Sequence, residues 1–113
     1  MNIEITPEVL ATQLGYSVSD ATINQAKAII ENTKGFDKFS KHVLTLIDSL
    51  AHINAYVAMS NSNNYLKVKI QPNDSMEIMD KFKEILEHFS NKYNIVLQKV
   101  DNKDVYYIIG IKE

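Results

Sequence analysis

The pattern of apolar and polar positions divides the chain into a helical first half and a second half that mixes strands with one helix. A first short helix is predicted after Thr6, which can cap it, with Pro7 in its first turn and Gly15 at its end. A second helix is predicted from the cap Ser19 to the stop Gly35. Residues 2 to 5 also alternate, and they are compatible with an additional edge strand.

A third, long helix is predicted from Phe36 to about Ser60. Its apolar residues alternate spacings of three and four, which is the seam of a heptad repeat. Neighbouring apolar positions widen this seam to about half of the helix circumference, which is more than one neighbour covers. The second contact is either the domain's own sheet and helices or the same helix of another chain. We expect helix 36–59 to form a homodimer seam through Phe39, Val43, Leu46, Leu50, Ile53, Asn54 and Val57.

Asn54 falls at the centre of this apolar arc by helical angle. A buried amide without a partner costs about 1 to 3 kcal/mol, so it needs a hydrogen bond. Its partner is either Asn54 of a second chain, which would fix the register of the pair, or a loop carbonyl of the same domain. The sequence leaves both alternatives open.

The second half reads strand, helix, strand, strand. Residues 65–70 alternate as a half-buried strand does. Residues 75–92 carry one apolar stripe, and Asp74 with Glu77 resembles a capping box at their start. Residues 95–100 and 105–111 are predicted to form a hairpin.

Residues 105–111, "VYYIIGI", are apolar on both faces, as a central strand should be. The neighbours 65–70 and 95–100 carry Lys67, Lys69 and Lys99, which suit edge strands. We therefore expect a split β-α-β sheet with the C-terminal strand central and a right-handed crossover. The predicted fold class is α+β, with N-terminal helices including one long helix followed by a β-α-β-β unit. A chain of 113 residues should form a single domain over residues 1–113, with a helical part at 1–60 and the sheet part at 65–113.

Composition removes several functions. The chain has no Cys, which excludes disulfides and thiolate metal sites, and all 12 of its basic residues are Lys. Without Arg, bidentate recognition of phosphates or guanine edges is weakened. The net charge of −2 shows no excess that would attract polyanions. The chain has no apolar run long enough for a membrane span and no signal-like start, so a cytoplasmic location without membrane contact is expected.

The histidines do not make a convincing reactive site. Asp48 with His52, and Glu84 with His88, are spaced by four, but both pairs are expected on solvated helix flanks. His42 is expected at the edge of the apolar arc, partly packed. The glycine loops and nucleophile elbows of known enzyme motifs are missing as well. We expect no catalytic residues, no metal site, no cofactor and no enzyme activity.

The first hypothesis for function is therefore a small cytoplasmic protein-interaction domain that binds a second copy of itself or another protein. A nucleic-acid-binding sheet module is the alternative. It would use Tyr65, Lys67, Lys69 and Tyr106, since aromatic rings can stack bases and lysines can contact the backbone. It ranks second because of the acidic balance, the missing Arg and the ordinary use of Lys at strand edges.

A third hypothesis is a small-ligand pocket between the long helix and the open face of the sheet. Tyr106, Ile108 and Met59 would be among the residues that line it.

Overall fold

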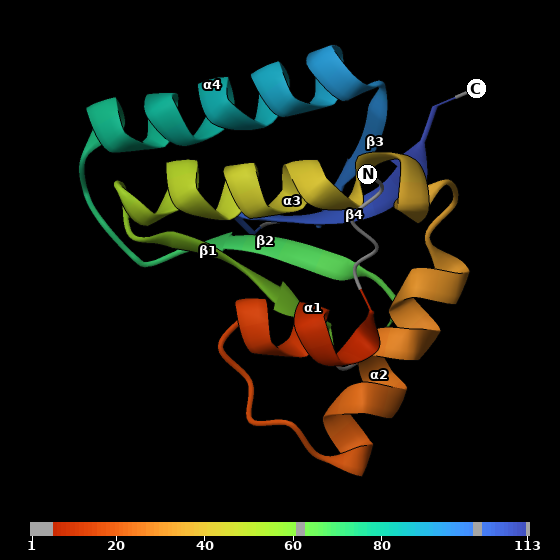
Figure 1. Ribbon diagram of the computed structural model, residues 1–113. Helices are drawn as coiled ribbons and strands as arrows, with labels where there is room; N and C mark the ends of the chain where they lie inside the picture. The colour runs from red at the N-terminus through yellow and green to blue at the C-terminus, as the bar shows by residue number, and fades with distance from the viewer. Residues whose placement is uncertain (1–5, 61–62, 101–102, 113) are drawn as a thin grey trace.

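The computed structural model describes residues 6–60, 63–100 and 103–112. Within these ranges the chain forms four helices and four strands (Figure 1). The predicted α+β class is confirmed, while the possible strand at residues 2 to 5 lies outside the described residues. In chain order the elements are α1 (Pro7–Gln13), α2 (Asp20–Asn32), α3 (Phe36–Ala51), β1 (Ala55–Met59), β2 (Leu66–Ile70), α4 (Met76–Tyr93), β3 (Ile95–Lys99) and β4 (Val105–Ile111).

The strands form one antiparallel sheet in the order β1-β2-β4-β3. The prediction that β4 lies between β2 and β3 is confirmed. Because β2 and β3 both run antiparallel to β4, they are parallel to each other, and α4 connects them as expected for a split β-α-β unit. The sheet also has a strand that the sequence analysis missed, since β1 pairs along the outer side of β2. Strand β2 is therefore interior, and the expectation that Lys67 and Lys69 mark an edge strand is wrong.

The expected helix 36–59 is shorter than predicted. Helix α3 ends at Ala51, and Asn54 takes a left-handed backbone conformation, with φ of 58°. A left-handed residue stops an α-helix, and Asn tolerates this conformation better than most residues. The chain then turns back as β1, and the carbonyl of Asn54 accepts a hydrogen bond from the N–H of Gln71 at 3.0 Å. The start of the fourth helix also differs, because the side chain of Ser75, and not Asp74, caps it by accepting from the N–H of Ile78.

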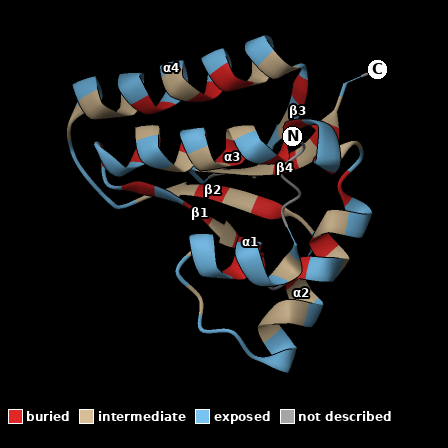
Figure 2. Cartoon of the chain, in the orientation of Figure 1, coloured by how far each residue is buried: buried red, intermediate tan, exposed pale blue. Residues whose placement is uncertain are grey.

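Helices α3 and α4 pack side by side over one face of the sheet (Figure 1). The hydrophobic core lies between these two layers, and the buried positions in Figure 2 follow the sides of the helices and strands that meet there. Helices α1 and α2 pack on each other, and α2 contacts β1 and α3, so this pair lies at the end of the sheet (Figure 1). Among the described residues, no helix layer like that of α3 and α4 covers the second face of the sheet.

Candidate nucleic-acid interface

The apolar residues expected to form a dimer seam are buried in the hydrophobic core of the single chain. The six apolar members are all buried: Phe39, Val43, Leu46, Leu50, Ile53 and Val57. Asn54 is exposed, so the expectation that it sits in the middle of an apolar arc is wrong. The wide arc of α3 is instead covered by the sheet and by α4 of the same chain.

The strand pairing assigns each residue to one of two sheet faces, because directly opposed residues of antiparallel strands point to the same side. On one side lie Val57, Val68 and Ile108, which are buried under α3 and α4. The opposite side, called the outer face below, consists of half-buried and exposed residues. Its members are Tyr56 and Ala58 of β1, Tyr65 just before β2, Lys67 and Lys69 of β2, Val96 and Gln98 of β3, and Val105, Tyr107 and Ile109 of β4.

The predicted partnership of Tyr106 with Tyr65 is wrong by one residue. Tyr106 is paired with Val68 on the helix-covered face, where its ring meets the edge of the Phe82 ring at a centroid distance of 5.9 Å. Tyr107 takes the expected place on the outer face. Its ring lies 6.1 Å from that of Tyr65, at an angle of 42°.

The aromatic and basic side chains of the outer face lie next to one another across the strands. Lys67 is opposed by Tyr107 on β4, and Lys69 is opposed by Tyr56 on β1. The hydroxyl of Tyr107 accepts a hydrogen bond from the side-chain amide of Asn63 at 3.2 Å, which fixes the outer end of the ring. Each lysine thus has a tyrosine on one neighbouring strand and a smaller apolar residue on the other, which is Ala58 for Lys67 and Val105 for Lys69.

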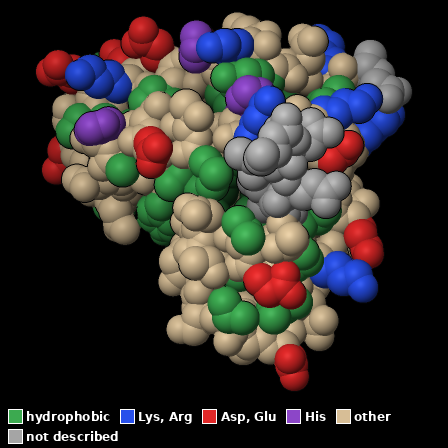
Figure 3. Space-filling view, in the orientation of Figure 1, with side chains coloured by type: hydrophobic (Ala, Val, Ile, Leu, Met, Phe, Trp, Pro, Cys, Tyr) green, Lys and Arg blue, Asp and Glu red, His purple; other side chains and the backbone are tan. Residues whose placement is uncertain are grey.

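The charge of the strands differs from that of the whole chain. The four strands contain three Lys and no Asp or Glu, whereas the whole chain has a net charge of −2. On the side of the molecule seen in Figure 3, by contrast, acidic and basic side chains are interspersed along the upper rim. Lysines protect the edge strands of a sheet from pairing, but β2 is an interior strand. Edge protection therefore does not account for Lys67 and Lys69, which makes them candidates for ligand contact.

The histidine pairs considered from the sequence lie at the surface. Asp48, His52, Glu84 and His88 are all exposed, as expected. Among the described residues, His, Asp and Glu side chains do not gather in groups of three or more that could hold a metal ion. Nothing in these pairs adds to the candidate interface.

His42 is half-buried between α3 and α4, and it stacks on Tyr93 with ring centroids 3.8 Å apart. Burial lowers the pKa of His42 below its usual value of 6.5, and the nearby charges of Lys41 and Lys92 lower it further. The neutral imidazole is therefore the form that the folded protein favours. The stacked pair is a contact between α3 and α4, on the face of the sheet opposite the candidate interface.

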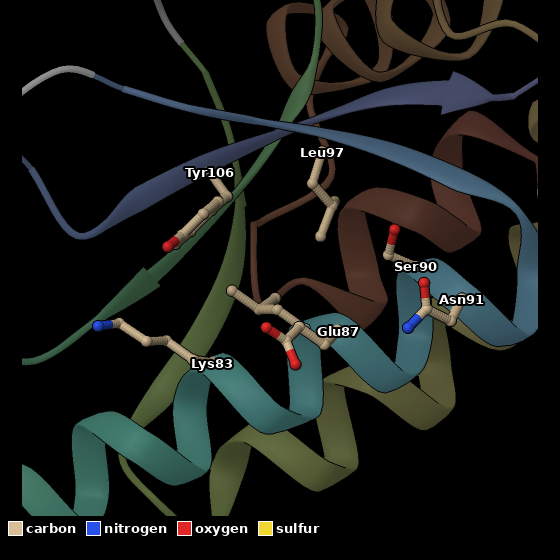
Figure 4. Close-up of a pocket in the computed structure, with 7 residues that line it drawn as sticks. Lys83, Glu87, Ser90, Asn91, Leu97 and Tyr106 are labelled. Carbon is tan, nitrogen blue, oxygen red and sulfur yellow. The ribbon is translucent and has the colours of Figure 1, made fainter.

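A hollow of about 290 Å³ lies between α4 and the strands β3 and β4 (Figure 4). Tyr106 lines it, but the hollow lies under α4 and not at the long helix of the third hypothesis, and Ile108 and Met59 are buried in the core instead of lining it. Lys83, Leu86, Glu87, Ser90, Asn91 and Leu97 form the rest of its wall.

No family model, curated protein or solved structure matches this chain. Helices long and apolar enough to cross a membrane are not found in the described part of the chain.

Proposed function

We propose that this protein is a small cytoplasmic binding domain without catalytic activity, and that its outer face binds single-stranded nucleic acid. One observation carries the proposal: Tyr65 and Tyr107 lie side by side, next to Lys67 and Lys69, on a sheet face that no helix layer covers within the described part of the chain. Tyr56, which is 37% exposed, extends this surface onto β1.

The surface has the chemistry that unpaired bases and their backbone need. Aromatic rings stack on bases of any sequence and contribute about 1 to 3 kcal/mol per base. Lysine ammonium groups attract phosphates as point charges, without the planar fork that lets Arg read a base edge. A surface of Tyr and Lys therefore supports binding that tolerates many sequences. A duplex would offer fewer stacking surfaces, since its bases are already stacked on one another.

A protein partner is the second candidate, and a different feature of the same surface favours it. Seven of the ten outer-face residues are apolar or aromatic, whereas the solvent side of an antiparallel sheet is usually polar. Exposed apolar patches of this kind mark protein interfaces. Two stacked copies of the outer face would bring their lysines together, so a different protein with acidic groups suits the surface better than a second copy does.

The test is binding of fluorescently labelled oligo(dT) and oligo(U) at low salt, measured by anisotropy. We expect binding that weakens as salt is raised, because phosphate contacts release counterions. The double variant Tyr65→Ala/Tyr107→Ala should weaken binding by tenfold or more, while Tyr65→Phe/Tyr107→Phe should retain most of it, because the rings still stack.

A matched pair of charge variants tests the lysines. Lys67→Gln/Lys69→Gln should weaken binding and flatten its salt dependence. Lys81→Gln/Lys83→Gln changes the net charge by the same amount on α4 and should change binding little. Equal effects of the two variants would mean that the attraction is unspecific. If the folded wild type binds neither oligonucleotide at low salt, the nucleic-acid proposal is overturned and the protein partner becomes the better hypothesis.

A further inference from the structure

The two edges of the sheet differ in what covers them. At the β1 edge, the N–H of Met59 donates to the hydroxyl of Tyr16 at 3.1 Å, and α2 packs against the strand. The β3 edge has β4 on one side and, within the described residues, no strand on the other. An uncovered edge presents backbone groups that can pair with another strand.

The hydrogen-bond pattern shows which groups of β3 point outward. The N–H of Val100 donates to the carbonyl of Val105 at 2.8 Å, so the backbone groups of residue 100 face β4. Because alternate residues of a strand direct these groups to opposite sides, those of Lys99 and Leu97 face the open edge. The carbonyl of Ile95 accepts a hydrogen bond from the hydroxyl of Ser90 at 2.6 Å and keeps its second lone pair for another donor.

We propose that β3 pairs with β3 of a second copy of this chain, antiparallel, with the two-fold axis at Leu97. In this register Leu97 faces its own counterpart, Ile95 faces Lys99 of the second copy, and Val96 faces Gln98. Like charges are not directly opposed in any of these pairs, which favours a second copy as the occupant of the edge. The pairing also covers Val96, which is 37% exposed in the single chain.

The hollow between α4 and the strands supports the same assembly. Leu97 forms part of its wall, together with Leu86 and Tyr106, next to the open edge (Figure 4). Residues paired across a two-fold axis in this way have Cα atoms about 5.5 Å apart, so Leu97 of the second copy would lie beside this apolar wall. Two sheets of four strands would then form one sheet, and their outer faces would become a single surface. Dimer formation does not require nucleic acid, so it can fail or succeed independently of the proposed function.

The first test is the mass of the free protein by size-exclusion chromatography with light scattering, at several concentrations. We expect twice the chain mass of 12.9 kDa at high concentration. Lys99→Pro should give the monomer, because Pro removes an N–H that faces the edge and leaves the bonds to β4 in place. Val96→Lys should do the same, while Val18→Lys, at a residue 55% exposed in the loop before α2, should leave the dimer intact.

A second test fixes the register. The chain has no cysteine, so Leu97→Cys introduces a single thiol at the proposed axis, and mild oxidation should link two chains rapidly. Asp48→Cys, at an exposed position on α3, should link them much more slowly. A wild-type monomer at every concentration overturns the proposal. So does a dimer that persists in folded Lys99→Pro and Val96→Lys.

Discussion

The backbone of Lys34 lies against Gly110, and the two residues form an isolated parallel bridge between the α2–α3 connection and the central strand. The N–H of Ile111 donates to the carbonyl of Lys34 at 2.8 Å. A Cβ atom on Gly110 would come within 2.7 Å of that carbonyl oxygen, and φ at this residue is +145°. The glycine therefore allows the connection to approach the sheet closely.

We expect Gly110→Ala to lower the free energy of unfolding by about 2 to 4 kcal/mol, because it combines backbone strain with an overlap that side-chain movement cannot relieve. Gly15→Ala is the control. Gly15 also has a positive φ, but its added Cβ would meet nothing within 4 Å, so a loss of only about 1 kcal/mol is expected. Urea unfolding of both variants measures the difference, and equal losses would contradict a close approach at Gly110.

Asn54 provides a second prediction about backbone conformation. Asn54→Gly should leave stability within a few tenths of a kcal/mol, since Gly adopts the left-handed conformation freely, whereas Asn54→Ala should cost about 1 kcal/mol. Neither variant should change the solution mass. A change of mass in Asn54→Ala would favour the seam hypothesis, in which this amide pairs across two chains.

A substitution at Leu50 tests whether α3 packs in the core of the single chain or against a second chain. Its side chain is fully buried, at 0% exposure, within a single chain. Leu50→Asp places an unpaired carboxylate there, and we expect loss of the folded state, seen as loss of the cooperative thermal transition in circular dichroism. A folded, monomeric Leu50→Asp protein would show instead that α3 faces a second chain.

The sequence predicted most of the sheet because two-sided apolar character identifies a central strand. Residues 105–111 have this character, and the structure places them in the centre as β4. The strand β1 was missed for a physical reason. Leu50, Ile53 and Val57 continue the heptad spacing of α3, but Ile53, Val57 and Met59 also fit strand alternation, and only the left-handed conformation of Asn54 decides between them. The sequence did carry one signal for a helix end followed by a strand: Asn tolerates the left-handed conformation, and the run after it contains Tyr and Val, which favour strands.

The candidate interface was predicted in part. Tyr65, Lys67 and Lys69 share one face, as expected, but the sequence had the phase of the central strand wrong. Residues 106 and 107 are both Tyr, with apolar residues on either side, so alternation does not tell which one faces the helices. Only pairing with β2 fixes the phase, because it sets Tyr106 opposite the buried Val68. A register of this kind is a property of tertiary structure.

Thr33 is a buried residue whose hydroxyl has no hydrogen-bond partner among the described residues. Thr33→Val replaces this hydroxyl by a methyl group of similar size, so we expect stability to rise by about 1 kcal/mol. Thr22→Val is the matched control with the opposite sign, since the Thr22 hydroxyl accepts from the N–H of Ser19 in the capping box of α2. Its loss should cost about 1 kcal/mol. Thermal unfolding of both variants at one pH tests the pair, and destabilisation by Thr33→Val would reveal a partner for its hydroxyl.

His42 makes the stability of the α3–α4 contact depend on pH. Burial, and then Lys41 and Lys92, lower the pKa of His42 in the folded state below the value of 6.5 that it has when unfolded. Between these two pKa values the unfolded chain binds more protons, so the contribution of this group is fully present above pH 6.5 and is lost as the pH falls toward the folded-state pKa. Protonation also places a third positive charge beside the two lysines.

His42→Phe keeps an aromatic ring against Tyr93 but cannot titrate. We therefore expect the wild type to lose more stability than His42→Phe between pH 7.5 and pH 5 in urea unfolding. The variant His52→Gln, at an exposed position, should follow the wild type and is the control for removing a histidine elsewhere in the chain. Parallel losses in wild type and His42→Phe would show that the histidine is not the group responsible, whereas a flatter profile in His42→Phe alone assigns the pH dependence to the stacked pair.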